Sequence, residues 1–402
     1  MKVQVIGGGG REHALAWKFA QYHQVIAYPG NPGIAQVARC VPAMEQDADL
    51  TVVGPEAPLV DGIVDRFRAR GQVIFGPTAA AAQLEGSKAF SKQFMMRAGI
   101  PTARFTAVAS LPEARAALKH FGYPVVLKAD GLAAGKGVVI AQTAEEAEHA
   151  LPALLSGPFL VIEEFLQGDE VSFIVLSDGT RALPLEPTQD HKAAYDGDRG
   201  PNTGGMGAYC DSTILTAQQT GVVMDRVILP TIEHMKQDGT PFTGFLYAGL
   251  MMTADGPKVL EFNARLGDPE TQALMHRMDS DFVPVLAAAA RGDLSGASIQ
   301  WKPDPSVCVV MAAHGYPGNV RTGDAITGIE AAETAGTIVF QAGTRIGPRG
   351  LETSGGRVLG VTASGETLGA AIGRAYAGVL KINFDGMHYR RDIGAKGLTR
   401  NS

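Results

Sequence analysis

Short apolar runs alternate with helix-like segments over the first hundred residues, and this alternation limits the possible fold more than any other feature. Residues 2–6 read as a buried strand, four glycines follow at 7–10, and residues 11–20 read as a helix. Further strand-like runs begin at residues 24, 50 and 72. Strands that alternate with helices form βαβ units on a parallel sheet. The sequence therefore predicts an N-terminal α/β domain over residues 1–101.

The composition indicates a soluble multidomain enzyme. A chain of 402 residues exceeds one ordinary core, and 45% hydrophobic with 19% charged residues is typical of globular proteins. A net charge of −6 without Lys/Arg clusters argues against a nucleic-acid partner. Three scattered cysteines predict packed thiols in a reducing compartment. No apolar run reaches the roughly 18 residues of a membrane span, and the N-terminus does not resemble a signal peptide. We expect a cytoplasmic protein.

Two familiar nucleotide motifs fail in this chain. The glycines at 7–10 do not complete G-x-G-x-x-G, because Glu12 and His13 stand where the last glycine is needed. Two interpretations of these glycines remain open: they bind an anion at the start of the helix, or they only allow a tight turn. The stretch "KADGLAAGKGVVIA" at 128–141 is not a Walker loop, since its glycines are wrongly spaced and a strand, not a helix, follows.

The rest of the chain predicts two further domains. Residues 102–300 form the second, with a small α+β subdomain at about 120–184, and a Pro-rich junction near 301 begins a strand-rich C-terminal cap over 301–402. A long polar stretch at 186–209 is either disordered or functional, and its composition favours function.

The motif "LEFNAR" carries the clearest chemistry. Glu261, Asn263 and Arg265 alternate, so a strand would place them on one face, with Leu260, Phe262 and Ala264 on the other. A carboxylate and an amide oxygen suit Mg²⁺, and an arginine fork suits a phosphoryl group. The alternative is an ordinary solvent-facing strand.

Several other groups fit phosphoryl transfer once they are combined. Lys88, Lys128 and Lys136 supply cations. Glu163, Glu164 and Glu170 lie where the chain passes between two subdomains, and the backbone N–H and C=O groups exposed there can contact an adenine edge. Taken alone, such acidic pairs usually indicate only a solvated surface.

The order of these motifs resembles the ATP-grasp superfamily. The pieces "GGGGREHAL", "EGSKAFSK", "QDHK", "DGDRGPNTGGMGAY", "FNARLGDPETQ" and "HGYPG" resemble, more narrowly, the phosphoribosylamine–glycine ligase family, also called glycinamide ribonucleotide synthetases. The resemblance covers nearly the whole chain. It implies an ATP-grasp fold behind a parallel α/β domain. It also implies the second step of de novo purine synthesis, in which glycine and 5-phosphoribosylamine are joined through glycyl phosphate while ATP becomes ADP and phosphate.

The resemblance also implies roles for individual residues. It makes Glu261 and Asn263 ligands of Mg²⁺ or Mn²⁺, and it gives catalytic roles to Arg265, Lys192 and Asp190. The ATP contacts that the resemblance implies are Lys88, Lys128, Lys136, Glu163, Glu164, Phe165, Glu170, Gly135 and Gly137, and it makes residues 131–137 a mobile flap. Its substrate contacts are Gly9, Gly10, Arg11, Glu12, Pro55, Glu56, Asn202, Thr203, Gly204, Gly205 and Met206.

Two departures and two rivals accompany this interpretation. Ala193 stands where relatives commonly carry a basic residue, and "GFLYAGLMM" lacks the further acidic metal ligand of many ATP-grasp enzymes. The rivals are another purine ATP-grasp enzyme, such as a carboxylase or a formyl-transferring ligase, and a nucleotide sensor without ligase activity. We expect a monomer that binds small molecules and neither nucleic acid nor membrane.

Overall fold

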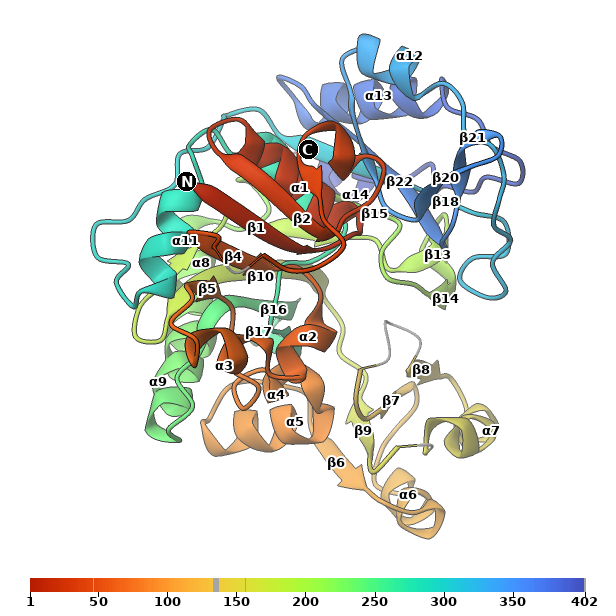
Figure 1. Ribbon diagram of the computed structural model, residues 1–402. Helices are drawn as coiled ribbons and strands as arrows, with labels where there is room; N and C mark the ends of the chain where they lie inside the picture. Colours follow the sequence, from red (N-terminus) through yellow and green to blue (C-terminus); the bar gives the residue numbers. More distant parts are fainter. Residues whose placement is uncertain (46, 133–136, 156, 401–402) are drawn as a thin grey trace.

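The computed structural model describes residues 1–45, 47–132, 137–155 and 157–400. Its N-terminal part is a parallel sheet with the order β3-β2-β1-β4-β5, which confirms the α/β arrangement expected from the sequence (Figure 1). The strands are β1 (Lys2–Gly7), β2 (Gln24–Pro29), β3 (Arg39–Cys40), β4 (Leu50–Val53) and β5 (Ile74–Phe75). The helical segments up to residue 97 are α1 (Gly10–Ala20), η1 (Ile34–Gln36), α2 (Glu56–Val60), α3 (Ile63–Arg68), α4 (Gln83–Gly86) and α5 (Lys88–Arg97).

The strand order reverses between β1 and β4. The loops that follow these two strands therefore diverge and leave a crevice at their carboxyl ends, where open α/β sheets usually bind ligands. Glycine is required here: Gly7 has a φ of 129°, and a Cβ on it would lie 2.4 Å from the Glu12 side chain.

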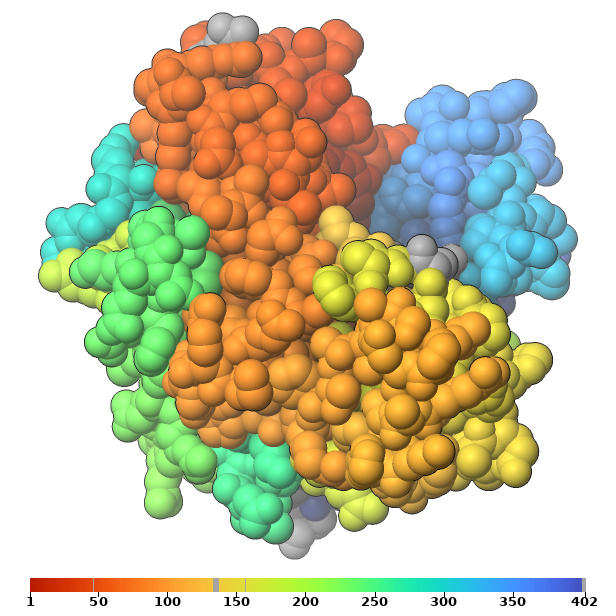
Figure 2. Space-filling model, turned by 90° about the horizontal axis from the view of Figure 1, so that it is seen from below, coloured from red at the N-terminus to blue at the C-terminus, as the bar shows by residue number. Residues whose placement is uncertain are grey.

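A small antiparallel sheet with the order β6-β9-β7-β8 forms a subdomain with its own hydrophobic cluster. Its elements are β6 (Phe105–Val108), α6 (Leu111–Leu118), β7 (Val125–Ala129), β8 (Val138–Ala141), α7 (Ala144–Leu154) and β9 (Leu160–Glu164). Figure 1 shows it projecting from the rest of the molecule beyond α5, and Figure 2 shows it from below, beside the region of α5. The subdomain begins before residue 120 and ends at β9, because the next strand pairs elsewhere.

That next strand, β10 (Asp169–Asp178), lies in a nine-stranded sheet whose main path is β17-β16-β10-β12-β15-β18-β22-β19. The other strands are β11 (Ala182–Pro184), β12 (Thr188–Asp190), β15 (Gly207–Cys210), β16 (Thr243–Thr253), β17 (Gly256–Asn263), β18 (Ser306–Ala312), β19 (Ile338–Gln341) and β22 (Arg357–Ser364). The sheet thus runs from the middle of the chain into the C-terminal region without a break.

Helices and two hairpins complete the fold. The helical segments are α8 (Ala217–Val223), η2 (Met224–Ile228), α9 (Leu229–Gln237), α10 (Glu270–Arg277), α11 (Val283–Ala290), α12 (Ile329–Thr334), α13 (Leu368–Val379) and α14 (Ala395–Arg400). The hairpins are β13 (Ala193–Tyr195) with β14 (Arg199–Asn202), and β20 (Thr344–Gly347) with β21 (Gly350–Thr353). Part of the polar stretch 186–209 is therefore an ordered hairpin. Among the described helices, none is both long and apolar enough to cross a bilayer.

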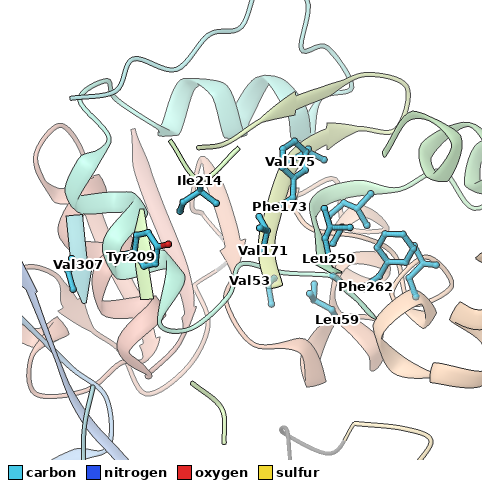
Figure 3. Packing of buried hydrophobic residues seen from close by; sticks show 14 of the residues in the cluster. Val53, Leu59, Val171, Phe173, Val175, Tyr209, Ile214, Leu250, Phe262 and Val307 are labelled. Atoms are coloured by element: carbon cyan, nitrogen blue, oxygen red, sulfur yellow. The ribbon is translucent and has the colours of Figure 1, made fainter. Parts of the chain in front are cut away.

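The main hydrophobic core extends across the large sheet. Val171, Phe173 and Val175 alternate along β10 and pack in one cluster with Leu250 of the adjacent strand β16 and Phe262 of β17, the strand beyond it (Figure 3). Tyr209 and Val307 continue the same cluster into the C-terminal strands. The large sheet therefore has a continuous apolar core on this face.

Candidate active site

A cavity of about 610 Å³ lies where the N-terminal loops, the small subdomain, the large sheet and the C-terminal region meet. Eighteen residues predicted from the sequence line it. They are Arg11, Pro55, Glu56, Lys88, Lys128, Gly137, Glu163, Glu164, Phe165, Glu170, Asp190, Lys192, Asn202, Thr203, Gly204, Glu261, Asn263 and Arg265. The structure therefore brings together groups that are spread from residue 11 to residue 265. Gly135 and Lys136 of the predicted flap lie outside the described residues.

Five predicted substrate contacts do not line this cavity: Gly9, Gly10, Glu12, Gly205 and Met206. Met206 is fully buried. The carboxylate of Glu12 accepts hydrogen bonds from the Gly9 backbone N–H (2.6 Å) and from Arg11 Nε (2.6 Å), and the residue is 3% exposed. Glu12 therefore caps the N-terminus of α1 and orients Arg11, which lines the cavity.

The strand that carries Glu261 and Asn263 does not alternate as regularly as the sequence suggested. In the pairing of β16 with β17, Gly249 lies opposite Glu261 and Leu250 lies opposite Val259, so Leu260 is the extra residue of a β-bulge. Leu260 consequently lines the cavity, which corrects the expectation that it fills the opposite face. Its carbonyl accepts a hydrogen bond from Lys128 Nζ at 2.9 Å.

The Glu261 carboxylate lies among cations. Lys192 Nζ is 3.6 Å from Glu261 Oε1 and 3.5 Å from Glu170 Oε2. Burial opposes ionisation of Glu261, but Lys192, Lys128 and Lys88 together lower its pKa to about 2. Conversely, burial tends to lower the pKa of Lys192, yet Glu170 and Glu261 raise it well above its ordinary value. Both groups are charged at neutral pH.

The donor set at Glu261 and Asn263 fits a hard divalent cation. An ionised carboxylate and an amide oxygen both line the cavity and are the ligand types that Mg²⁺ prefers, with remaining positions filled by water or phosphate oxygens. Among the described residues there is no cluster of three or more Asp, Glu, His or Cys that could form an all-protein metal cage. The pair therefore suits a cation that is shared with a phosphate-bearing ligand.

Lys88 and Lys128 approach the cavity from different elements. Ser87 caps α5 by accepting from the Phe90 N–H (3.1 Å), which places Lys88 in the first turn, with its Nζ 2.7 Å from the Gly131 carbonyl. Burial lowers the pKa of Lys88, although Glu261 opposes this effect. Lys128 projects from β7, one strand away from Glu163 on β9.

Lys92 was missed by the sequence analysis. Its Nζ lies 2.8 Å from Glu163 Oε2 and donates to Thr102 Oγ1 at 2.7 Å, and the residue is 2% exposed. Burial lowers its pKa to about 8 even though Glu163 stabilises the charged form. Glu163 Oε1 lies 2.9 Å from Lys128 Nζ without a well-aligned hydrogen bond, so this contact is an ion pair. The i, i+4 spacing of Lys88 and Lys92 was the available signal, since it places both on one helix face.

Arg265 is already held by two carboxylates. Its Nη2 lies 2.8 Å from Glu85 Oε1, and its Nε lies 3.2 Å from Glu56 Oε2. Glu85, which the sequence analysis also missed, accepts from the Ala264 N–H at 2.7 Å, and burial raises its pKa. These contacts fix the guanidinium at the edge of the cavity next to Glu261 and Asn263.

The C-terminal region adds two lining residues that the sequence analysis did not single out. Arg357 Nη1 donates to the Gly204 carbonyl (2.7 Å), and its Nη2 lies 3.3 Å from Asp268 Oδ2. The Tyr316 hydroxyl accepts from the Gly204 N–H (3.0 Å). The loop 202–204 is thus fixed from the C-terminal side. Nearby, burial and the charge of Glu270 raise the pKa of Asp190 well above its ordinary value.

Family models match three successive parts of the chain. Residues 1–85 match the N domain of phosphoribosylglycinamide synthetase, residues 86–271 its ATP-grasp (A) domain and residues 306–396 its C domain. Curated proteins called phosphoribosylamine–glycine ligase are similar over the full chain. That of Ralstonia nicotianae is 51% identical, with 100% of both chains covered, and that of Escherichia coli O157:H7 is 50% identical, with 100% of this chain and 99% of the relative covered.

Solved structures agree with this match. A crystal structure of phosphoribosylamine–glycine ligase from Thermotoga maritima superposes with a TM-score of 0.87 at 36% identity, covering 98% of this chain and 100% of that one. The biotin carboxylase domain of a Hydrogenobacter thermophilus 2-oxoglutarate carboxylase, solved with MgADP and bicarbonate, has a TM-score of 0.72 at 19% identity, covering 96% and 91%. The second likeness shows the fold alone.

Proposed function

The chain belongs to the phosphoribosylglycinamide synthetase family, and from this premise we propose that it joins glycine to 5-phospho-D-ribosylamine while ATP becomes ADP and phosphate. The product is glycinamide ribonucleotide, formed in the second step of de novo purine synthesis. The observation that carries the proposal is the convergence of Lys88, Lys128, Lys192 and Arg265 on one ionised carboxylate, Glu261, in one cavity.

The chemistry requires a carboxylate to be activated before an amine can attack it. A glycine carboxylate oxygen forms a bond to the γ-phosphorus as the bond from that phosphorus to the bridging oxygen breaks, which gives glycyl phosphate and ADP. The amine nitrogen then attacks the acyl carbon, the bond to the phosphate oxygen breaks, and the nitrogen loses a proton. Both steps move negative charge, so fixed cations provide most of the catalysis.

We assign the phosphate contacts to Lys88 and Lys128, and stabilisation of the transferring phosphoryl group to Arg265. Glu261 and Asn263 would hold Mg²⁺ or Mn²⁺, which neutralises phosphate oxygens when bound. The adenine edge would meet the backbone at Glu164 and Phe165, beside the apolar side chains of Leu166, Met251 and Leu260 that line this part of the cavity. Glu170 would accept from the ribose.

The remaining contacts belong to the glycine and amine side of the cavity. Asp190, Lys192 and the loop 202–204 would contact these substrates. Arg11 would hold the sugar phosphate at the crevice after β1 and β4, where Pro55 and Glu56 also line the cavity. For Glu12, we replace the predicted direct contact by a supporting role, because both carboxylate oxygens are already engaged. The monomeric state and cytoplasmic location are kept as expectations from the sequence.

The test is release of ADP and phosphate with ATP, Mg²⁺, glycine and phosphoribosylamine generated in situ. We expect turnover only when glycine and the amine are both present. Replacing glycine with bicarbonate or formate distinguishes the ligase from a carboxylase or a formyl-transferring enzyme. ADP release that depends on bicarbonate or formate, or ATP binding without any turnover, would exclude the proposal.

A further inference from the structure

The C-terminal segment 388–396 lies against the turn that follows Lys192. At its centre, Arg390 is fully buried. Its guanidinium donates to Asp392 Oδ1 and Oδ2 (both 2.7 Å), to the Ala193 carbonyl (3.1 Å) and to Asp198 Oδ1 (3.0 Å). A buried arginine with four such acceptors is a strong and directional anchor, because the planar guanidinium fixes each partner in position.

The same segment contacts the residues on both sides of Lys192. Upstream, the Gly394 N–H donates to His191 Nε2 (3.3 Å). Downstream, Arg390 binds the Ala193 carbonyl, and the His388 ring lies 2.7 Å from the Ala194 carbonyl. Between these anchored residues, Lys192 leaves the backbone toward the cavity, where its Nζ lies 3.5 Å from Glu170.

The far end of the hairpin is anchored by charge. Asp198 has a φ of 55°, a left-handed conformation in which Asp and Asn are the best tolerated residues apart from Gly. Its carboxylate joins Arg390 to Lys396, whose Nζ lies 2.5 Å from Oδ2. The turn is therefore held by two cations from the C-terminal segment rather than by its own hairpin hydrogen bonds alone.

We propose that Arg390 is a positioning residue that, through Ala193 and Asp198, sets the place of Lys192 between Glu170 and Glu261. This inference rests on the proposed function. It predicts a selective effect, since Lys88 and Lys128 are placed by α5 and β7, which Arg390 does not contact. Loosening the anchor should impair use of glycine and the amine more than use of ATP, because the phosphate contacts of Lys88 and Lys128 stay in place while only the Glu170 and Glu261 side of the ATP site faces Lys192.

The test compares Asp198→Asn with Asp385→Asn. Asparagine keeps the size of the side chain and tolerates a positive φ, so the substitution weakens the charge contact with little backbone cost. Asp385 is an exposed residue of the C-terminal region whose carboxylate pairs with Arg321 (2.6 Å). Lys396→Gln is a second variant that loosens Asp198 and leaves Arg390 in place.

In Asp198→Asn we expect the KM for glycine or the amine to rise roughly tenfold, because a displacement of about 1 Å in a positioned group can cost about 100-fold. The KM for ATP should rise less than this, because Lys88 and Lys128 keep their positions even though Lys192 also lies near Glu170 and Glu261. Amide hydrogen exchange across 191–203 should accelerate, but not across β17. Lys396→Gln should shift the same parameters less, and Asp385→Asn should match the unsubstituted chain.

Two results would overturn the inference alone while the unsubstituted chain remains active. One is faster exchange across 191–203 with unchanged KM values for glycine and the amine. The other is an equal rise in the KM for ATP, which would indicate general destabilisation. Absence of glycine-dependent turnover in the unsubstituted chain would instead remove the proposed function and this inference together.

Discussion

Lys128 Nζ lies 2.9 Å from Glu163 Oε1, and the two side chains occupy adjacent antiparallel strands of the small subdomain. The other oxygen of Glu163 pairs with Lys92 on α5, outside that subdomain. One buried carboxylate therefore joins the small sheet to the helix that also carries Lys88. Together with the Leu260 carbonyl, Glu163 therefore positions Lys128, and its buried carboxylate is not free to contact a base.

Replacing Glu163 by glutamine should weaken nucleotide binding. The change leaves Lys92 buried without a counter-charge and Lys128 without its ion pair, and breaking a buried pair typically costs roughly 3–5 kcal/mol. We expect the dissociation constant for ATP, measured by titration calorimetry, to rise about tenfold as Lys128 moves, together with a lower unfolding temperature. The control is Glu148→Gln, which removes an exposed pair with Arg115 in the same subdomain. Equal ATP affinity in the two variants would contradict the positioning role.

Glu261→Ala should abolish turnover and leave the fold intact. The side chain is 36% exposed and lines the cavity, so its loss opens no core, while the metal pair and one of the two carboxylate partners of Lys192 are lost. A loss of at least about 1000-fold in kcat is expected if phosphoryl transfer depends on this charge arrangement. Asp255→Asn, at the exposed turn before β17, is the matched control. Near-normal activity of Glu261→Ala would refute the metal assignment.

His13 should make the protein sensitive to acid. Its Nδ1 accepts from the Gln341 N–H (2.8 Å), and burial lowers its pKa to about 4, against about 6.5 when unfolded. Between these values the unfolded chain binds the extra proton, so this stabilisation is complete above about pH 6.5 and is lost as the pH falls toward 4, by about 1.4 kcal/mol per unit.

Urea titrations at pH 7, 6 and 5 check this expectation. His13→Gln should be less stable at neutral pH. Its free energy of unfolding should fall less on acidification, because up to one proton fewer is taken up on unfolding. His149→Gln, an exposed change on α7, should keep the original pH dependence. If the free energy of unfolding of His13→Gln depends on pH as steeply as that of the unsubstituted chain, other groups control the acid response.

Only one thiol should react in the folded protein. Cys210 and Cys308 are fully buried, and burial raises the pKa of each to about 12, whereas Cys40 is half-buried. Because the thiolate is the reactive form, a thiol-specific disulfide reagent should modify at most Cys40 under native conditions and all three cysteines after denaturation. Cys40→Ser should remove the native reaction. Modification of two thiols without unfolding would contradict the packing described above.

The sequence predicted those parts of the fold that local patterns determine. The parallel sheet followed from strands alternating with helices and glycine turns, and its confirmation rests on pairings between near neighbours such as β1 and β2. The assignment of β10 could not be predicted in the same way. Its partner β16 lies far along the chain, and a local pattern does not specify which distant strand will pair with it.

The site shows a similar limit. Glu261 and Asn263 were predicted because their alternation on a strand has an immediate chemical meaning, but the bulge at Leu260 depends on the pairing with β16. Arg357 was missed because it reaches the cavity only through the fold, from a strand with no distinctive local motif. Lys92 had a visible spacing with Lys88, but in the sequence its burial is not apparent.

The pairing of β15 with β18 has a consequence for how this chain can be divided. These strands hydrogen-bond across the Pro-rich stretch at 301–305, from Gly207 opposite Val309 to Cys210 opposite Ser306. What looks in the sequence like a joint between modules is bridged by one continuous ladder. A gene split at that stretch would yield two fragments, each with an unpaired edge strand, and unpaired edge strands tend to pair with strands of other chains. The C-terminal region is therefore not a portable module, and fusions or grafts need their breakpoints elsewhere.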